Sequence, residues 1–454
     1  MFLLASVTIG TSVRAEEPLG RGKRWVRSHP FNTMALTIIS KSFDPHEYKA
    51  ANMTTVLAWK PNTGLLEEGA SVGLPWHLNV RRRGLNKDGL TDQTKARLKN
   101  LHDNYSGCTG WIVWDEPKRS EMFIVAKAIQ WLKETYPDTL VYSNAYPMGG
   151  QTPMRRAKME RYYGGELPEG GYSYEQYLRD FATIMKPDVI MYDAYIFRQS
   201  GETSNLFPTM MTGRKVAQER GVPCWSFVQS YADKLASRNS RTPSESDVRM
   251  QVFMHLTSGY TGIAYFTYED QQGPAMVSNA DRQLRPLYYH VARLNQEVLN
   301  VGQALRFLER TAVRYVPGSG NRVPEGVTAW QPGDGGVKQI KAITIEDAEP
   351  DDWKDVLVGF FTDDRGRRYF MLTNLWHDMD ASSAQRALTV TLTLDRKVKM
   401  IGRLSRETGR PESLAVTGGK FRMTLPGGTG DLLRFGDAEF PGLGHDLSAS
   451  YNDK

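Results

Sequence analysis

The stretch that decides the fold is CTGWIVWDEP, residues 108–117. Its first seven residues are mainly apolar, aromatic or β-branched, which is typical of a buried parallel strand. Pro117 lacks a backbone N–H and ends the strand, so Asp115 and Glu116 stand at its carboxyl end, where α/β sheets carry their functional groups. The same two acids would also suit the first turn of a helix that begins near Ser120.

Eight strand-like runs alternate with helical segments between residues 33 and 308. The predicted strands are 33–39, 54–59, 70–76, 108–114, 139–144, 188–193, 223–229 and 262–268. This number and rhythm predict an α/β fold of the (β/α)8 TIM-barrel type. A doubly wound open sheet is the alternative, but no GxGxxG or Walker glycine pattern follows any of these runs.

After residue 308 the pattern changes to short alternating runs separated by loops rich in glycine and proline. Asp363-Asp364-Arg365-Gly366 is typical of a hairpin turn between two such runs. We therefore expect a small antiparallel β-sandwich domain. The expected organisation is a barrel at 16–310, a β-sandwich at 311–436 and a polar tail at 437–454.

The composition of the 454-residue chain suits a packed protein, since 40% of its residues are hydrophobic and 11% are aromatic. The net charge of +6 is mild, and no nucleic-acid-binding motif accompanies it, so we expect no nucleic-acid partner.

Cys108 and Cys224 fall in strand-like runs and are expected to be buried, small apolar residues. The eight histidines lack HExxH or CxxC spacing, so we expect no metal site, and no pattern indicates a cofactor.

The first 15 residues resemble a segment that is removed during export. Residues 2–9 are apolar, and Val13 and Ala15 supply small side chains at the positions that define a cleavage site. This pattern predicts a signal peptide, although a basic start is missing, and a secreted or periplasmic protein. A frayed N-terminus is the alternative. No later stretch is long and apolar enough to span a membrane.

In a barrel of this kind, functional side chains come from the carboxyl ends of several strands. Those positions carry acids, amides and aromatic residues: Trp59, Trp76, His77, Asp115, Glu116, Asn144, Tyr146, Asp193, Tyr195, Gln229, Tyr231, Tyr268 and Glu269. Aromatic faces stack on sugar rings, and amides and carboxylates form hydrogen bonds with hydroxyl groups. The pattern therefore predicts a carbohydrate ligand.

The chain resembles the TIM-barrel glycoside hydrolases that carry a C-terminal β-sandwich, here ending in LPGGTGDLL at 425–433. Asp115-Glu116-Pro117 is similar to the strand-four motif of the N-acetylhexosaminidases of glycoside hydrolase families 20 and 123. That resemblance implies substrate-assisted catalysis, in which Glu116 protonates the leaving oxygen and Asp115 orients the acetamido group of the substrate.

The same motif also resembles the retaining β-glycosidases whose strand-four Asn-Glu supplies the acid/base residue. There the fit is incomplete. Asp115 stands where those enzymes have asparagine, and Gln229 stands where their nucleophilic glutamate should be on strand seven.

Glycoside hydrolysis usually needs a proton donor and a second carboxylate across the bond that breaks. We expect Glu116 to be the donor, because Trp114 and Pro117 offer an apolar setting that favours a protonated carboxyl group. The second carboxylate is Asp193 or Asp115, unless the substrate supplies its own nucleophile; Glu269 is a weaker candidate. A Glu116–Asp193 separation of about 5–5.5 Å predicts retention, and one of about 6.5–9.5 Å predicts inversion.

The predicted function is thus an exported glycoside hydrolase that cleaves a poly- or oligosaccharide. A non-catalytic carbohydrate-binding barrel is the alternative from another class, and a polysaccharide lyase is a third. Arg81-Arg82-Arg83 and Arg155-Arg156 indicate an anionic substrate with uronate or sulfate groups, unless they are solvated loop charges.

Overall fold

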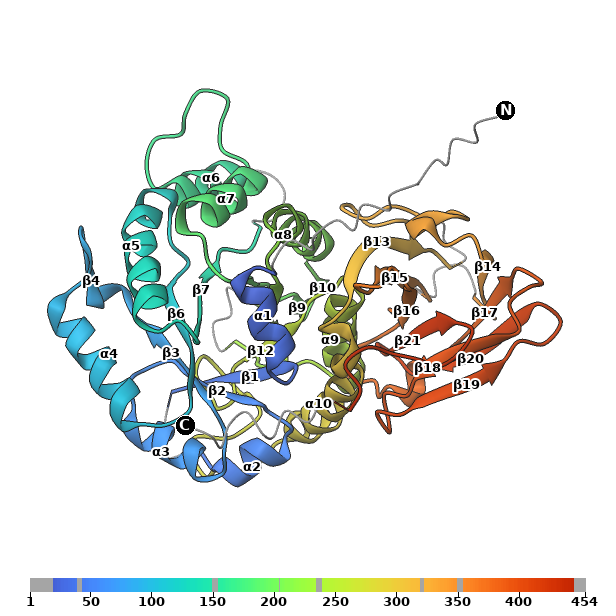
Figure 1. Ribbon diagram of the computed structural model, residues 1–454, viewed down its shortest axis with the longest axis horizontal. Coiled ribbons are helices and arrows are strands. Elements are labelled where there is room, and N and C mark those ends of the chain that lie inside the picture. Colours follow the sequence, from blue (N-terminus) through green and yellow to red (C-terminus); the bar gives the residue numbers. More distant parts are fainter. Residues whose placement is uncertain are drawn as a thin grey trace, which may run out of the picture.

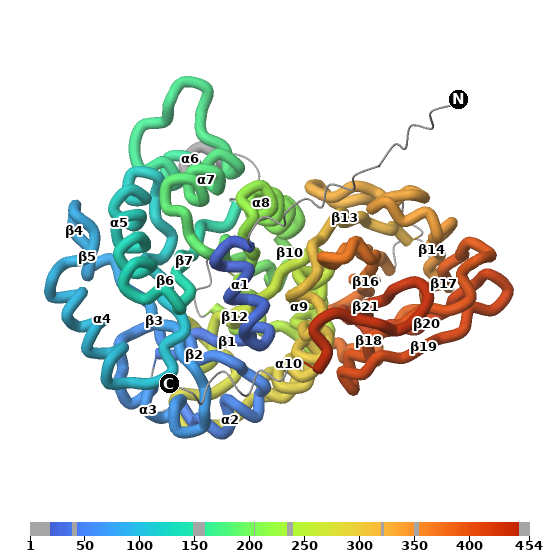
Figure 2. The backbone as a smooth tube through the Cα atoms, viewed as in Figure 1, coloured from blue at the N-terminus to red at the C-terminus, as the bar shows by residue number. Residues whose placement is uncertain are grey.

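In the computed structural model, a closed barrel lies beside two antiparallel sheets (Figure 1, Figure 2). The structure describes residues 19–38, 43–148, 154–203, 205–233, 239–318, 322–348 and 354–444, with the backbone alone at 154–158. The predicted signal peptide at 1–15 and residues 445–454 of the predicted tail lie outside the described residues. Within the described part of the chain, no helix has the length and apolar character needed to cross a membrane.

Eight parallel strands close the barrel in the order β1-β12-β11-β8-β7-β6-β3-β2. They are Asn32–Thr37 (β1), Thr55–Ala58 (β2), Trp76–Val80 (β3), Cys108–Asp115 (β6), Leu140–Ala145 (β7), Ile190–Asp193 (β8), Cys224–Gln229 (β11) and Gly262–Phe266 (β12). The (β/α)8 architecture is confirmed, and so are seven of the eight predicted strands. These runs were visible in the sequence because side chains fill the inside of the barrel and helices cover the outside, which makes both strand faces apolar.

The third predicted strand, 70–76, is wrong. Its first two residues end helix α3 (Thr63–Ser71), and the barrel strand occupies Trp76–Val80 instead. Gly73 adopts a left-handed φ of 75° just after the helix, and its N–H bonds to Ala70 O over 2.9 Å. This is a common way for a helix to end, and the apolar residues around it belong to the helix end and its exit loop.

The helices that follow the strands form the outer layer of the barrel (Figure 1). They are Pro45–Ala50 (α2), Thr63–Ser71 (α3), Asp92–Asn104 (α4), Arg119–Thr135 (α5), Tyr174–Asp180 (α7), Leu206–Arg220 (α8), Glu245–Thr257 (α9) and Pro286–Leu305 (α10). A π-helical turn, Phe181–Met185, extends α7. The insertions carry Met154–Tyr163 (α6) and two short hairpins, Leu85–Asn86 with Gly89–Leu90 (β4, β5) and Phe197–Arg198 with Gly201–Glu202 (β9, β10).

Helix α1 (Arg21–Ser28) precedes β1 and closes the amino-terminal end of the barrel. Its Trp25 ring lies against His77 and Trp225 in the barrel interior, with centroids 5.6 and 5.7 Å away. The Arg21 guanidinium donates to the Asp188 carboxylate over 3.1 Å. Because α1 blocks this end, a ligand has access to the barrel only from the carboxyl ends of the strands, which we call the mouth.

Two antiparallel sheets follow the barrel and enclose a second hydrophobic core. One sheet has the order β13-β15-β16-β21-β18-β19, and the other has the order β14-β17-β20. Their strands are Glu309–Val316 (β13), Ile340–Ile345 (β14), Val356–Thr362 (β15), Arg368–Asn374 (β16), Leu388–Leu394 (β17), Met400–Leu404 (β18), Pro411–Ala415 (β19), Lys420–Leu425 (β20) and Gly430–Phe435 (β21). The predicted β-sandwich is therefore confirmed, and the predicted hairpin turn joins β15 to β16.

Candidate functional site

The mouth is lined by the last inward-facing residue of each barrel strand, because side chains alternate between the inside and the outside. In six of the eight strands, these positions carry Trp59, Asn79, Asn144, Asp193, Gln229 and Phe266. The loops after β1, β7 and β11 also reach this end, and they include residues outside the described part of the chain (39–42, 149–153 and 234–238).

A bulge in β6 adds Asp115 to this layer. The register with β7 shifts between Ile112 and Asp115, and the backbones of Trp114 and Glu116 adopt left-handed φ angles of 59° and 52°. Such angles cost about 1 kcal/mol or more in a residue other than glycine, and they cluster at functional sites. The bulge turns Trp114 outward into the core beneath the helices and leaves Asp115 facing the mouth.

Asn144 joins two carboxylates across the end of β7. Its Nδ2 donates to Asp115 Oδ1 and to Asp193 Oδ1, each over 3.0 Å. Since both oxygens contact the same nitrogen, they can lie no more than about 6 Å apart. Asp115 ends β6 and Asp193 ends β8, so the structure brings together acids from two strands that flank β7.

The two acids differ in their surroundings. Asp115 is exposed at the rim, but protein atoms surround much of its carboxyl group. This burial raises the pKa of Asp115, and the hydrogen bond from Asn144 offsets part of the rise. Asp193 is buried, and it accepts a hydrogen bond from the same amide. The raised pKa suits Asp115 to hold a proton.

Glu116 lies beside this pair and faces the insertion after β7. Its N–H donates to Asn144 O over 3.0 Å, and its Oε2 lies 3.3 Å from Arg161 Nη2. The Arg161 guanidinium also covers the Tyr146 ring, 4.7 Å from its centroid. The ion pair favours the charged form of Glu116, and the buried Tyr146 ring supports Arg161.

Tyr195 and Phe266 form an aromatic part of the mouth. Their rings stack with centroids 5.1 Å apart, and the buried Tyr231 ring meets them edge-on at 5.4 and 5.1 Å. Trp59, at the end of β2, is half-buried and lies edge-on to Phe227 at 6.3 Å. Burial raises the pKa of Tyr195, so its hydroxyl stays neutral and can donate a hydrogen bond.

The prediction that Trp76 and His77 lie at the mouth is wrong. Strand β3 begins at Trp76, so both residues occupy its amino-terminal part. Trp76 Nε1 donates to Ser106 O over 2.8 Å, and His77 Nδ1 lies 2.9 Å from the Tyr142 hydroxyl inside the barrel. Burial lowers the pKa of His77 to about 3, so the ring is neutral. Both are core residues.

Gln229 ends β11 as predicted, but its side chain holds loops together. Its Nε2 lies 2.9–3.2 Å from the carbonyl oxygens of Phe197, Tyr231 and Arg241, which share its two hydrogens. Its Oε1 accepts a hydrogen bond from Phe197 N over 2.9 Å. The amide is fully buried and its bonds are all to backbone groups, so in this structure Gln229 holds the loops and presents no exposed group to a ligand.

Tyr268 and Glu269 also lie away from the centre of the mouth. Strand β12 ends at Phe266, two residues before the predicted end. The Tyr268 ring packs outside the barrel, 5.0 Å from the Tyr48 ring. Glu269 is buried, and its Oε1 accepts from Ile38 N over 2.6 Å. We therefore assign Tyr268 to the core and Glu269 to the connection between β12 and β1.

Three residues at the mouth were not predicted. Asn79 was missed because the third strand was misplaced, and its Oδ1 is buried without a donor among the described residues. Phe266 would follow from strict two-residue alternation after Ala264. Arg161 lies in an insertion rich in basic residues, where no pattern distinguishes it from its neighbours.

One cluster of possible metal ligands occurs among the described residues: Glu202, Asp247 and His377. Both ring nitrogens of His377 already contact a carboxylate, at 2.7 and 3.0 Å. The cluster joins the barrel to the β-sandwich and lies outside the mouth. Cys108 and Cys224 are free thiols in the barrel wall and belong to no such cluster in the described structure.

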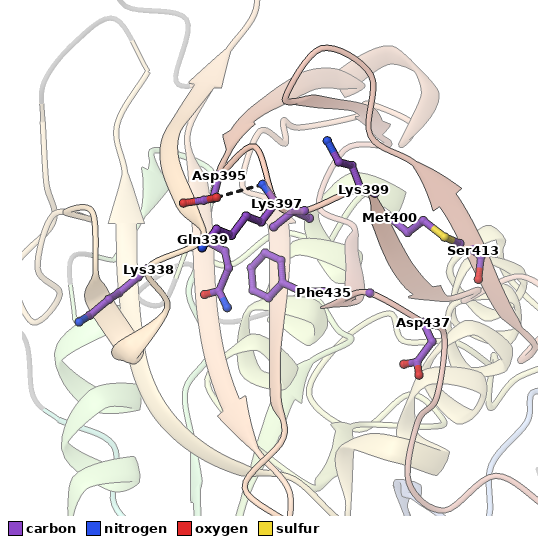
Figure 3. A pocket seen from close by; sticks show the side chains of 11 residues that line it. Lys338, Gln339, Asp395, Lys397, Lys399, Met400, Ser413, Phe435 and Asp437 are labelled. Carbon is purple, nitrogen blue, oxygen red and sulfur yellow. Dashed lines mark hydrogen bonds between the residues drawn. The ribbon is translucent and has the colours of Figure 1, made fainter.

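A hollow of about 700 Å³ lies at the edge of the β-sandwich (Figure 3). Its lining includes Lys338, Lys397 and Lys399 together with Asp395 and Asp437. These acids have cationic partners, at 3.5 Å for Asp395 and 3.0 Å for Asp437. Because no amide joins two acids there, the mouth of the barrel is the better candidate for chemistry.

No protein-family model matches the chain, and no curated protein matches it. Among solved structures, an endo-β-1,4-mannanase from Thermotoga petrophila is 11% identical, with 76% of this chain and 95% of that chain covered and a TM-score of 0.41. α-Galactosidase I from Mortierella vinacea is 10% identical, with 93% of this chain and 94% of that chain covered and a TM-score of 0.43. A β-galactosidase from Halorubrum lacusprofundi is 12% identical, with 60% of this chain and 59% of that chain covered and a TM-score of 0.41. Likenesses this distant identify neither a family nor a function for the chain.

Proposed function

We propose that the chain is a glycoside hydrolase whose carboxylate pair is Asp115 and Asp193. The observation that carries the proposal is the Asn144 bridge, which holds one oxygen of each acid within about 6 Å of the other. Retaining glycosidases keep their carboxyl groups about 5–5.5 Å apart, and inverting ones keep them about 6.5–9.5 Å apart. The bridge therefore favours a retaining mechanism.

The raised pKa of Asp115 supports a division of roles in which Asp115 is the proton donor. Protonated Asp115 gives its proton to the glycosidic oxygen, while an Asp193 oxygen bonds to the anomeric carbon and the bond to the leaving group breaks. In the second step, ionised Asp115 takes a proton from water, and the water oxygen displaces Asp193 from the anomeric carbon. Both acids return to their starting states.

The rest of the mouth is compatible with a sugar ring. Tyr195, Phe266 and Trp59 offer partly exposed aromatic surface. In the same layer, the Oδ1 atoms of Asn79 and Asn144 are buried acceptors without a donor among the described residues.

Glu116, the donor predicted from the sequence, is the second candidate for that role. Its ion pair with Arg161 stabilises the carboxylate form, and we place it second for that reason. In a substrate-assisted mechanism the roles would differ, since Glu116 would donate the proton and Asp115 would orient an acetamido group.

Three nearly isosteric variants separate these roles on a panel of nitrophenyl glycosides and polysaccharides. We expect Asp115→Asn and Asp193→Asn each to lower kcat at least about 1,000-fold, and Glu116→Gln to lower it less than about 10-fold. Asp92→Asn, a change of a fully exposed acid on α4, is the matched control and should keep wild-type activity. Proton NMR of the first-formed product should show the anomeric configuration of the substrate.

The same assays can reject the proposal. If kcat fell severely in Glu116→Gln while Asp193→Asn stayed active, Glu116 would be the proton donor and Asp193 would have no part in the reaction. Activity on N-acetylhexosaminides alone would favour the substrate-assisted mechanism. A wild-type protein that binds oligosaccharides but releases no sugar would instead be a carbohydrate-binding barrel.

A further inference from the structure

A second feature at the mouth is a hollow of about 550 Å³, which takes no part in the chemistry above. We call it the cationic hollow, and it is lined by Arg81, Arg82, Arg83, Leu85, Asn86, Lys87, Trp114 and Ile124. Its volume lies within the range of about 300–1,000 Å³ that small-ligand sites occupy. Four of its lining side chains are cationic and none is acidic.

Most of this positive charge is not balanced within the protein. Arg82 pairs with Glu121 at 3.2 Å, and its guanidinium lies 5.1 Å from the centroid of the Trp114 ring. In the described structure, Arg81, Arg83 and Lys87 form no ion pair. Burial, and then the charge of Arg83, lower the pKa of Arg97 on the adjoining helix α4. Cations gathered in one hollow repel one another, and a bound anion would relieve that repulsion.

The cationic hollow adjoins the carboxylate pair in the fold. Arg81 directly follows β3, and Trp114 directly precedes Asp115 in the neighbouring strand β6. The bulge in β6 turns these two consecutive side chains to opposite sides, with Asp115 toward the mouth and Trp114 toward the cationic hollow. A chain of sugar residues that crosses the rim beside β6 would contact both places.

The cationic hollow is also held in shape by contacts with α5. The β4–β5 hairpin lies beside this helix (Figure 1), and Lys127 Nζ donates to Lys87 O over 3.0 Å. Gly89 fits closely against α5, because a Cβ there would lie 2.9 Å from Lys127 Cβ. These contacts fix the backbone of the β4–β5 hairpin, which borders the cationic hollow, before an anion binds.

We propose that the cationic hollow binds a uronate or sulfate group of a polysaccharide, at a sugar residue some distance from the bond that is cleaved. The proposal rests on the proposed glycosidase function of the mouth and names the class of its substrate, an anionic polysaccharide. Carboxylate and sulfate oxygens both match the fork of N–H groups on arginine, so Arg81 and Arg83 are the specificity-determining residues.

Binding of three hexasaccharides to the Asp193→Asn protein, measured by calorimetry, tests the proposal without turnover. The probes are oligogalacturonate, a chondroitin sulfate hexasaccharide and the neutral cellohexaose. We expect at least one anionic probe to bind about tenfold or more tightly than cellohexaose, and that preference to weaken as salt is added. Comparison of the two anionic probes distinguishes a carboxylate site from a sulfate site.

The variant Arg81→Ala/Arg83→Ala should lose about tenfold in affinity for the preferred anionic probe. The matched control Lys397→Ala/Lys399→Ala removes the same charge from the hollow on the β-sandwich (Figure 3) and should change Kd less than twofold. Equal losses in both variants would overturn the proposal, because net charge alone would then attract the anion. Equal affinity for cellohexaose, or equally strong binding of a DNA duplex, would also overturn it.

The failure of this proposal is distinguishable from failure of the glycosidase proposal. If the protein cleaves neutral glycosides and Arg81→Ala/Arg83→Ala leaves kcat/KM unchanged on every substrate, the hydrolase stands and the anionic site is rejected. If anionic hexasaccharides bind through Arg81 and Arg83 but are never cleaved, the site stands and hydrolysis is rejected.

Discussion

At the scale of single residues, Asn144 controls both acids through one nitrogen atom. In Asn144→Ala, Asp115 loses the hydrogen bond that lowers its pKa, while burial continues to raise it. The pKa of Asp115 should therefore rise further, and the basic limb of the pH profile of kcat/KM should move to higher pH. We also expect kcat to fall about 10- to 100-fold, because the two carboxylates lose their fixed spacing.

Asn79 provides the control for this prediction. It is another buried amide at the mouth, but no hydrogen bond joins it to Asp115 or Asp193 in the described structure. Asn79→Ala should leave the basic limb at the wild-type pH. An equal shift in both variants would contradict a specific role for Asn144 in setting the protonation of Asp115.

Single positions could be predicted from the sequence better than the contacts of their side chains. Asp115, Asn144 and Asp193 stand at strand ends, as the strand pattern predicts, but nothing local indicates that one amide joins the two acids. Gln229 also stands at a strand end, yet it bonds to distant backbone groups that no sequence pattern brings near it. Arg161 comes from an insertion without any signal.

At the scale of elements, helix α1 depends on the small size of one residue. A Cβ on Gly22 would lie 1.9 Å from Asp188 O, a backbone atom held in the barrel. Gly22→Ala should displace α1 and lower the free energy of unfolding by about 2–4 kcal/mol, as measured by urea denaturation. Gly20→Ala is the control, since its Cβ would lie 3.6 Å from the nearest atom. Equal destabilisation by both changes would contradict this account.

The same helix shows why some elements could not be predicted. Its sequence, RGKRWVRS, contains four cations and a glycine and has no acidic residue in its first turn, so neither propensity nor charge indicates a helix. The helix forms because Trp25 is buried in the barrel floor and Arg21 bonds to Asp188, which are long-range contacts. The barrel strands were predictable because burial of both faces leaves a local apolar run.

At the scale of the whole molecule, α9 connects the barrel to the β-sandwich. Twelve of its 13 residues are buried, since it packs against β11 on one side and against β15 and β16 on the other. Gln251 of this helix accepts from Gln229 N and donates to Ala194 O, each over 3.0 Å. The interface between the barrel and the β-sandwich therefore supports two strand ends at the mouth. Hydrophobic periodicity does not reveal this role, because a helix without an exposed face has no amphipathic pattern.

His377 of the β-sandwich completes this interface through two carboxylates. Its Nδ1 lies 2.7 Å from Asp247 on α9, its Nε2 lies 3.0 Å from Glu202 on β10, and Arg241 also pairs with Asp247. Burial alone would lower the pKa of His377, but the two carboxylates raise it to about 9. Because the folded protein holds this proton more tightly than the unfolded chain, the stabilisation is complete below about pH 6.5 and is lost as the pH rises through about 9.

His377→Gln should therefore lower the free energy of unfolding by up to about 3 kcal/mol near pH 6 and by much less above pH 9. Thermal unfolding between pH 6 and pH 10 measures this difference: the Tm of the wild type should decline across the interval more steeply than that of the variant. His46→Gln, a change of an exposed histidine on α2, should keep the wild-type decline. If the Tm of the wild type and that of His377→Gln declined in parallel, another group would be releasing the proton. The contact between the barrel and the β-sandwich would then not depend on a charged His377.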